Sequence, residues 1–200
     1  MDLKTCLDLN NSDKSFKHKY DTIYEPHLAE VRNNPINLLE IGIFKGESIS
    51  AWLDYFPNAT IYGVDIFERV KSEDISILDN VRVRWKECDS TKHYPADWEN
   101  IKFDFIIDDG LHTPEANKQT FANFSPHLSE TGVYFVEDVW PLDIMTEEQL
   151  KQPWIRNKPE YELNQYTSFL ETIHDYGRCK LHDLRKETRK PDSCIWEIKR

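Results

Sequence analysis

The order of apolar and glycine-containing segments over residues 36–65 constrains the fold more than any other part of this sequence. The segment 36–42 is apolar nearly throughout, as expected for a central parallel strand covered on both faces. A glycine-containing turn and a helical segment over 49–55 follow, and a second strand over 59–65 ends in an acid. This order is the layout of a nucleotide-binding βαβ unit. We therefore predict a Rossmann-like, doubly wound α/β fold.

The turn and the acid of this unit indicate a nucleoside-containing ligand. Gly42 and Gly46 let the backbone approach a ligand closely. Asp65 lies 25 positions after Glu40 (65 − 40), near the distance at which an acid accepts hydrogen bonds from both ribose hydroxyls. Phe44 stands where a pyrophosphate-binding turn has its middle glycine, which favours a ligand without phosphate, such as S-adenosylmethionine. An ordinary α/β crossover that ends in an acid remains the alternative.

Two later apolar runs are each followed by a pair of acids. The first pair is Asp108 and Asp109, with His112 close behind, and the second is Glu137 and Asp138. Because ligands gather at the carboxyl ends of strands in an α/β sheet, these side chains are expected to converge. Carboxylate oxygens suit Mg²⁺, and a His beside the ion is placed to take a proton from a hydroxyl. The pattern predicts a metal-assisted methyl transfer, although His112 could instead cap a helix or lie free on the surface.

The remaining patterns complete a mostly parallel seven-stranded sheet with an antiparallel C-terminal hairpin. The expected strands are 81–85, 103–107 and 132–136, followed by a hairpin of 179–184 and 193–198. The expected helices are 20–32, 116–128 and 166–176.

The length of 200 residues predicts one domain over 1–200. Residues 1–34 form a helical lead-in, which either packs on the edge of the domain or closes over the donor's site. Residues 140–165 are expected to be a substrate loop or lid, because long irregular connections in compact domains are often binding loops.

Charge and cysteine usage exclude several partners. The formal net charge of −11 opposes binding to nucleic acid and to anionic membranes. No apolar run approaches the roughly 20 residues of a membrane span, and the polar first 19 residues have no signal-peptide core. The four cysteines are scattered without a CxxC pair, which predicts a reduced, cytoplasmic protein; a disulfide between Cys179 and Cys194 is the minor alternative.

Three stretches of the sequence resemble a known family. Residues 37–66 (NLLEIGIFKGESISAWLDYFPNATIYGVDI) resemble motif I of class I S-adenosylmethionine-dependent methyltransferases. The run DDGLH followed by GVYFVEDV is similar to the metal-dependent sugar O-methyltransferases of macrolide biosynthesis, the mycinamicin type, including the spacing of 28 from Asp109 to Glu137 (137 − 109). The opening NSDKSFKHKYDTIYEPHL resembles their lead-in, so the resemblance covers about residues 11–140.

The resemblance implies a role for each matched position. It implies that Mg²⁺, or another hard divalent ion, is held by Asp109, Glu137 and Asp138, with His112 as general base. It implies that S-adenosylmethionine is the methyl donor and that its site is lined by Glu40, Gly42, Asp65, Asp89 and Asp108, with Ser12, Lys14 and Tyr20 as further candidates. For Asp89, which could bond the adenine amino group, an N-cap of the following turn is the alternative. Leu111 in place of a usual Ser, and Phe44 in place of a glycine, depart from the family pattern.

The implied activity is O-methylation of a hydroxyl on a sugar or similar small polyhydroxylated acceptor, by a chain that could form a homo-oligomer. Two alternatives stay open at this point. The chain could bind the donor and use another acceptor, as in N-methylation, or it could be a non-catalytic relative of the same fold.

Overall fold

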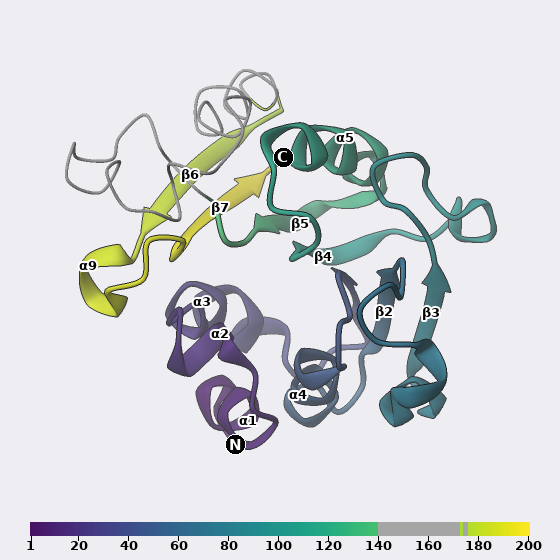
Figure 1. Ribbon diagram of the computed structural model, residues 1–200, viewed down its shortest axis with the longest axis horizontal. Coiled ribbons are helices and arrows are strands. Elements are labelled where there is room, and N and C mark those ends of the chain that lie inside the picture. Colours follow the sequence, from purple (N-terminus) through teal and green to yellow (C-terminus); the bar gives the residue numbers. More distant parts are fainter. Residues whose placement is uncertain (140–172, 174–175) are drawn as a thin grey trace.

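A computed structural model describes residues 1–139, residue 173 and residues 176–200 (Figure 1). The predicted substrate loop, 140–165, lies outside the described residues. So does the predicted helix 166–176, apart from Ile173 and Tyr176.

The sheet has seven strands in the order β3-β2-β1-β4-β5-β7-β6, which confirms the predicted architecture. The strands are β1 (Asn37–Ile41), β2 (Thr60–Asp65), β3 (Val83–Glu87), β4 (Phe103–Asp108), β5 (Leu128–Val136), β6 (Arg178–Asp183) and β7 (Cys194–Lys199). The first five strands pair in parallel, and β7 pairs antiparallel with both β5 and β6. The carboxyl ends of β1 to β5 therefore lie at one edge of the sheet.

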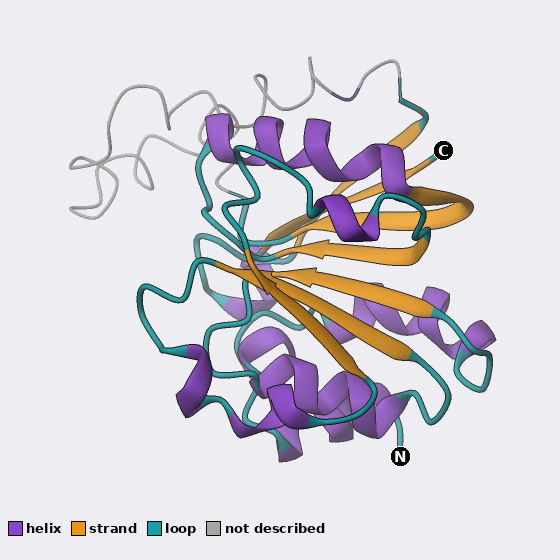
Figure 2. Ribbon diagram, turned by 90° about the vertical axis from the view of Figure 1, so that its right-hand side faces the viewer, coloured by secondary structure: helices purple, strands orange, loops and turns teal. Residues whose placement is uncertain are grey.

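Helices cover both faces of this sheet, with α1 to α4 on one side and α5 on the other (Figures 1 and 2). The α-helices are α1 (Leu3–Leu9), α2 (Asp13–Phe16), α3 (Asp21–Val31), α4 (Glu47–Tyr55), α5 (Pro114–Phe124) and α9 (Arg185–Thr188). The short 3-10 helices are η1 (Ser72–Asp74), η2 (Ser76–Asp79), η3 (Ala96–Trp98) and η4 (Ser125–His127).

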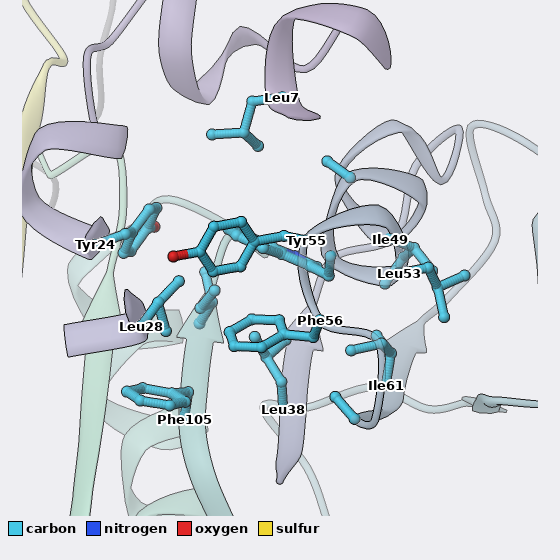
Figure 3. Close-up of a cluster of buried hydrophobic side chains, with 14 of the residues drawn as sticks. Leu7, Tyr24, Leu28, Leu38, Ile49, Leu53, Tyr55, Phe56, Ile61 and Phe105 are labelled. Carbon is cyan, nitrogen blue, oxygen red and sulfur yellow. The ribbon is translucent and has the colours of Figure 1, made fainter. Parts of the chain in front are cut away.

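The lead-in contributes to the larger of two buried apolar layers. Alternate residues of β1 point to opposite faces, so that Leu38 joins one layer and Leu39 the other. Leu7 and Tyr24 of the lead-in pack into the same layer as Leu38 and Phe105 (Figure 3). The predicted helix over 20–32 is present as α3, and its inner face is fully buried. The lead-in is thus part of the domain's core.

The third strand is Val83–Glu87, whereas the sequence pattern predicted 81–85. The guanidinium of Arg82 donates to the carbonyls of Leu53 and Phe56 at the end of α4, and the Asn80 side chain accepts from the Arg82 N–H. The Arg82 carbonyl already accepts from the Ile61 N–H of β2, but its N–H is taken by the Asn80 side chain, and the strand begins one residue later.

The helix predicted over 116–128 begins and ends earlier. Thr113 caps α5 by accepting from the Ala116 N–H at 3.2 Å, with a proline at the first helical position. The helix ends at Phe124, and η4 follows with Pro126, which has no N–H to continue the helical ladder. The predicted end at 128 was therefore wrong, since β5 already begins at Leu128.

The structure shows the state of the cysteines and the character of the helices. All four cysteines are free thiols. Within the described part of the chain, none of the helices has the length and apolar character that crossing a membrane requires.

We expect Gly42→Ala to destabilise the protein by about 3 kcal/mol or more, measured by urea unfolding. Gly42 has φ +95°, and a Cβ there would overlap the backbone carbonyl of Asp109. Gly110→Ala is the matched control, because its Cβ would meet its nearest atoms at 3.3 Å and its φ is not positive. Equal stability losses in the two variants would contradict this account of the turn.

Candidate active site

A cavity of about 350 Å³ opens at the carboxyl ends of β1 to β4. Its wall consists of residues 12–14, 41–45, 47–48, 64–66, 68–70, 88–91 and 109–111. Of the residues predicted for the donor's site, Ser12, Lys14, Gly42, Asp65 and Asp89 lie on this wall. Glu40, Asp108 and Tyr20 lie outside the lining formed by the described residues.

Asp65 shapes the turn that forms one side of the cavity. Its Oδ2 accepts from the N–H groups of Ile43 and Phe44 at 2.7 and 2.9 Å, and its Oδ1 accepts from the Phe67 N–H at 2.8 Å. Phe44 takes the left-handed conformation, with φ 51°, at the position where the sequence pattern lacks a glycine. Because a carboxylate has about four acceptor sites, Asp65 keeps capacity for a ribose hydroxyl.

Glu40 lies beneath the cavity. Its Oε2 accepts from the Ser48 hydroxyl at 2.8 Å and from the Trp52 indole N–H at 3.0 Å, and its Oε1 lies 3.2 Å from Lys14 Nζ. Burial raises the pKa of Glu40, and the Lys14 ammonium opposes that rise. Ser48 and Lys14 both line the cavity, so Glu40 holds two residues of the cavity wall without lining the cavity itself.

Asp89 and Asp108 each organise a loop. Asp89 Oδ1 accepts from the N–H and the hydroxyl of Thr91, so Asp89 caps a turn and also faces the cavity. Asp108 accepts from the Gly110 N–H and the Asn117 side chain, both at 3.3 Å. Burial raises the pKa of Asp108 to about 6. Asp108 thereby supports the loop that carries the next acid.

The strand registers bring the two acidic strand ends together. Asp108 of β4 is paired with Ile41 of β1 on one side and with Val136 of β5 on the other. Asp109 and Glu137 come next along these strands, and their N–H groups donate to Ile41 and Asp108 at 2.9 Å. The side chains that follow β4 and β5 therefore share one corner of the sheet edge.

Asp109, His112 and Asp138 form a group that suits a divalent cation. One ligand atom from each lies within 4.8 Å of the others. His112 Nε2 is 3.6 Å from Asp109 Oδ1 and 3.9 Å from Asp138 Oδ2. All three side chains are partly open to solvent, at 27%, 30% and 17% exposure for Asp109, His112 and Asp138. The two carboxylates are oxygen ligands of the kind that Mg²⁺ prefers, and the imidazole beside them suits a base better than a ligand of such an ion, so the residues fit the predicted metal and base.

Glu137 lies beside this group but faces the lead-in. Its Oε1 accepts a short hydrogen bond from the Tyr24 hydroxyl, and its Oε2 accepts from Lys14 Nζ at 2.8 Å. Burial raises the pKa of Glu137 well above its usual value; Asp109 adds to the rise and Lys14 opposes it. The structure therefore brings together Asp109, His112 and Asp138. It holds Glu137, the fourth residue predicted for metal and base, in a hydrogen bond with Lys14.

Several residues of this corner were not predicted from the sequence. Tyr24 holds Glu137, and the imidazole of His18 lies 3.5 Å from Asp138 Oδ1 and 2.9 Å from the Ser193 hydroxyl. Tyr20, predicted for the donor's site, instead donates to Asp138 Oδ1 at 2.8 Å. The four-residue spacing that puts both tyrosines near one face of α3 was a usable signal, whereas the contact with Ser193 joins opposite ends of the chain.

The fold and the cavity together define a class of protein: a Rossmann-like domain with a cavity beyond the carboxyl ends of its parallel strands, where such folds bind their ligands. Residues 39–139 match the family model described as a methyltransferase domain. The chain belongs to this methyltransferase family.

Curated relatives agree with the resemblance found in the sequence. Mycinamicin VI 2''-O-methyltransferase of Micromonospora griseorubida is 31% identical over 135 residues, which are 62% of this chain and 32% of that protein. L-olivosyl-oleandolide 3-O-methyltransferase of Streptomyces antibioticus is 33% identical over 135 residues, 62% of this chain and 34% of the relative. The chain thus spans about a third of the length of these relatives. The predicted likeness to the mycinamicin type is confirmed.

Solved structures share the fold. MycE methyltransferase from the mycinamycin biosynthetic pathway, in complex with Mg, SAH and mycinamycin VI, superposes with a TM-score of 0.70 at 24% identity, covering 100% of this chain and 54% of that one. Aeropyrum pernix fibrillarin with bound S-adenosyl-L-methionine superposes with a TM-score of 0.57 at 17% identity, covering 82% of this chain and 66% of the other.

We expect Asp65→Asn to lower stability by about 1–3 kcal/mol, because an amide nitrogen cannot accept from the backbone N–H groups that the carboxylate now serves. Urea unfolding measures the loss. Asp79→Asn, on the exposed side of η2, is the control and should leave stability nearly unchanged. A variant as stable as the wild type would show that these hydrogen bonds do not hold the turn.

Proposed function

We propose that this chain is an S-adenosylmethionine-dependent, Mg²⁺-dependent O-methyltransferase that acts on a hydroxyl of a sugar or similar small polyhydroxylated acceptor. The observation that carries the proposal is the position of the Asp109, His112 and Asp138 group at the cavity. Asp109 belongs both to that group and to the cavity wall, so a donor in the cavity and a cation on the group would be neighbours. The named activities of the curated relatives, which are sugar O-methylations, support the acceptor class.

The metal would be held by Asp109 and Asp138, with Glu137 completing the predicted set if Lys14 releases it. When bound, such an ion would lower the pKa of an acceptor hydroxyl and help to fix its direction.

The chain's own groups supply the proton transfer and the positioning. His112 Nε2 accepts the hydroxyl proton, and the carboxylates of Asp109 and Asp138 at 3.6 and 3.9 Å stabilise the resulting imidazolium. Asp65 and Asp89 on the cavity wall would orient the donor's ribose and adenine. Holding the sulfonium methyl group in line with the acceptor oxygen contributes much of the remaining rate enhancement.

The partner of this chain is therefore proposed to be a small-molecule acceptor. One domain over 1–200, a cytoplasmic location and homo-oligomerisation remain predictions of the sequence.

The deciding experiment is a screen of hydroxylated sugars and their glycosides with radiolabelled S-adenosylmethionine, with and without MgCl₂. Label transferred to a hydroxyl only when Mg²⁺ is present supports the proposal. Transfer to an amine would establish N-methylation instead. Failure to bind S-adenosylhomocysteine in isothermal titration would rule out every function that depends on this methyl donor.

We expect His112→Ala to bind S-adenosylhomocysteine as the wild type does and to lose turnover by roughly 10²- to 10⁴-fold, because only proton removal is lost. Isothermal titration and a radiolabel assay measure the two quantities. His93→Ala changes an exposed His whose side chain is not part of the cavity wall, and it should keep full turnover. An active His112→Ala protein would take this imidazole out of the mechanism.

Removing the metal should stop turnover reversibly. EDTA is expected to abolish methyl transfer, and an excess of MgCl₂ should restore it. Asp109→Asn should not regain activity with MgCl₂, since an amide is a weaker and uncharged ligand. Glu115→Gln, an exposed change on α5, serves as the control. Methyl transfer that survives EDTA would rule out the metal-dependent mechanism.

A further inference from the structure

Lys14 places a buried ammonium against the carboxylates of the candidate site. The residue is 1% exposed, and its Nζ lies 2.6 Å from Asp109 Oδ2, 2.8 Å from Glu137 Oε2 and 3.2 Å from Glu40 Oε1. It also lies on the cavity wall. The ammonium therefore has three carboxylate partners within 3.2 Å.

Two of the three partners are residues to which the proposed function assigns the metal. A divalent cation on Asp109 and Glu137 would sit within a few ångströms of the ammonium, in a buried corner where water screens charges poorly. Like charges at that separation repel strongly. The ammonium and the cation therefore compete for these carboxylates.

The surrounding contacts keep the ammonium in this position. The Lys14 carbonyl accepts from the Tyr20 N–H at 2.7 Å, and the Tyr24 hydroxyl holds the other oxygen of Glu137. Glu40, the third carboxylate at the ammonium, is itself fixed by Ser48 and Trp52. Glu40 thus offers Lys14 a partner that is not part of the metal set.

We infer that Lys14 is an internal competitor of the metal: its ammonium binds Asp109 and Glu137, and a divalent cation gains those carboxylates only by displacing the ammonium toward Glu40. This inference rests on the proposed function, because it assumes that the acidic corner binds a divalent cation. The consequence is that Lys14 lowers the metal affinity of the site. Because Lys14 also lines the donor cavity, its displacement by the metal would change the wall of that cavity.

The test compares Lys14→Met with Lys17→Met. Lys17 lies three residues further on the same lead-in and pairs with Asp13 at 3.2 Å; Asp138 acts on it only at longer range, and among the described residues it has no ion pair with Asp109, Glu137 or Glu40. Isothermal titration with MgCl₂ should show that Lys14→Met binds Mg²⁺ at least about tenfold more tightly than the wild type, because the opposing charge is gone. Lys17→Met should keep the wild-type affinity for Mg²⁺. Lys14→Met should also unfold at a lower temperature than the wild type in EDTA, and MgCl₂ should raise that temperature more than in the wild type.

A second measurement uses the wild-type protein and so does not depend on the variant folding. Side-chain ¹⁵N NMR follows the lysine ammonium signals during titration with MgCl₂. The Lys14 signal should shift with the same midpoint as metal binding, while the Lys17 signal should stay in place.

The outcomes separate the inference from the proposed function. Wild-type protein that binds Mg²⁺ while its Lys14 signal does not move, or a Lys14→Met protein whose Mg²⁺ affinity is unchanged or weaker, would overturn the inference and leave the function intact. Wild-type protein that does not bind Mg²⁺ would overturn both the inference and the metal-dependent function.

Discussion

Buried carboxylates at the ends of parallel strands need counter-charges, and this need ties the lead-in to the sheet. Asp109, Glu137 and Asp138 reach the same corner because β4 and β5 pair in parallel and end at one edge. Burial, the nearby Asp109 and their mutual repulsion raise the pKa of Glu137 and of Asp138. The Lys14 ammonium and the Tyr24 hydroxyl, both from the lead-in, satisfy Glu137 there. The site is therefore complete only when the first helices are packed against the sheet.

The same corner joins the two halves of the proposed chemistry. Lys14 and Asp109 lie on the cavity wall and also bond to each other, so a ligand in the cavity and a cation on the carboxylates share neighbours. The His112 side chain is only partly buried, at 30% exposure, so this corner of the site is open to solvent. Donor, metal and base are thus assigned to adjacent groups on one sheet edge, an arrangement that an in-line transfer requires.

The sequence pattern predicted most of the fold because apolar periodicity is a local property. The βαβ unit over 36–65 and the antiparallel closing hairpin both form as expected. The predicted bounds of the third strand and of the helix over 116–128 were wrong, because a side-chain contact or a single proline overrode the apolar periodicity there. The Asn80 side chain takes the Arg82 N–H just before β3, and Pro126 ends the helical segment early.

The sequence by itself determined which acids follow which strands, since strand order and the position of each acid are set by residues close together in the chain. Tertiary structure alone decided the partner of each acid. Lys14 meets Asp109 and Glu137 across 95 and 123 residues of sequence, and no local pattern encodes such a contact. For the same reason the structure, rather than the spacing, placed Glu40 beneath the cavity and Tyr20 against Asp138. Side-chain hydrogen bonds depend on positions that only the packed sheet and lead-in define together.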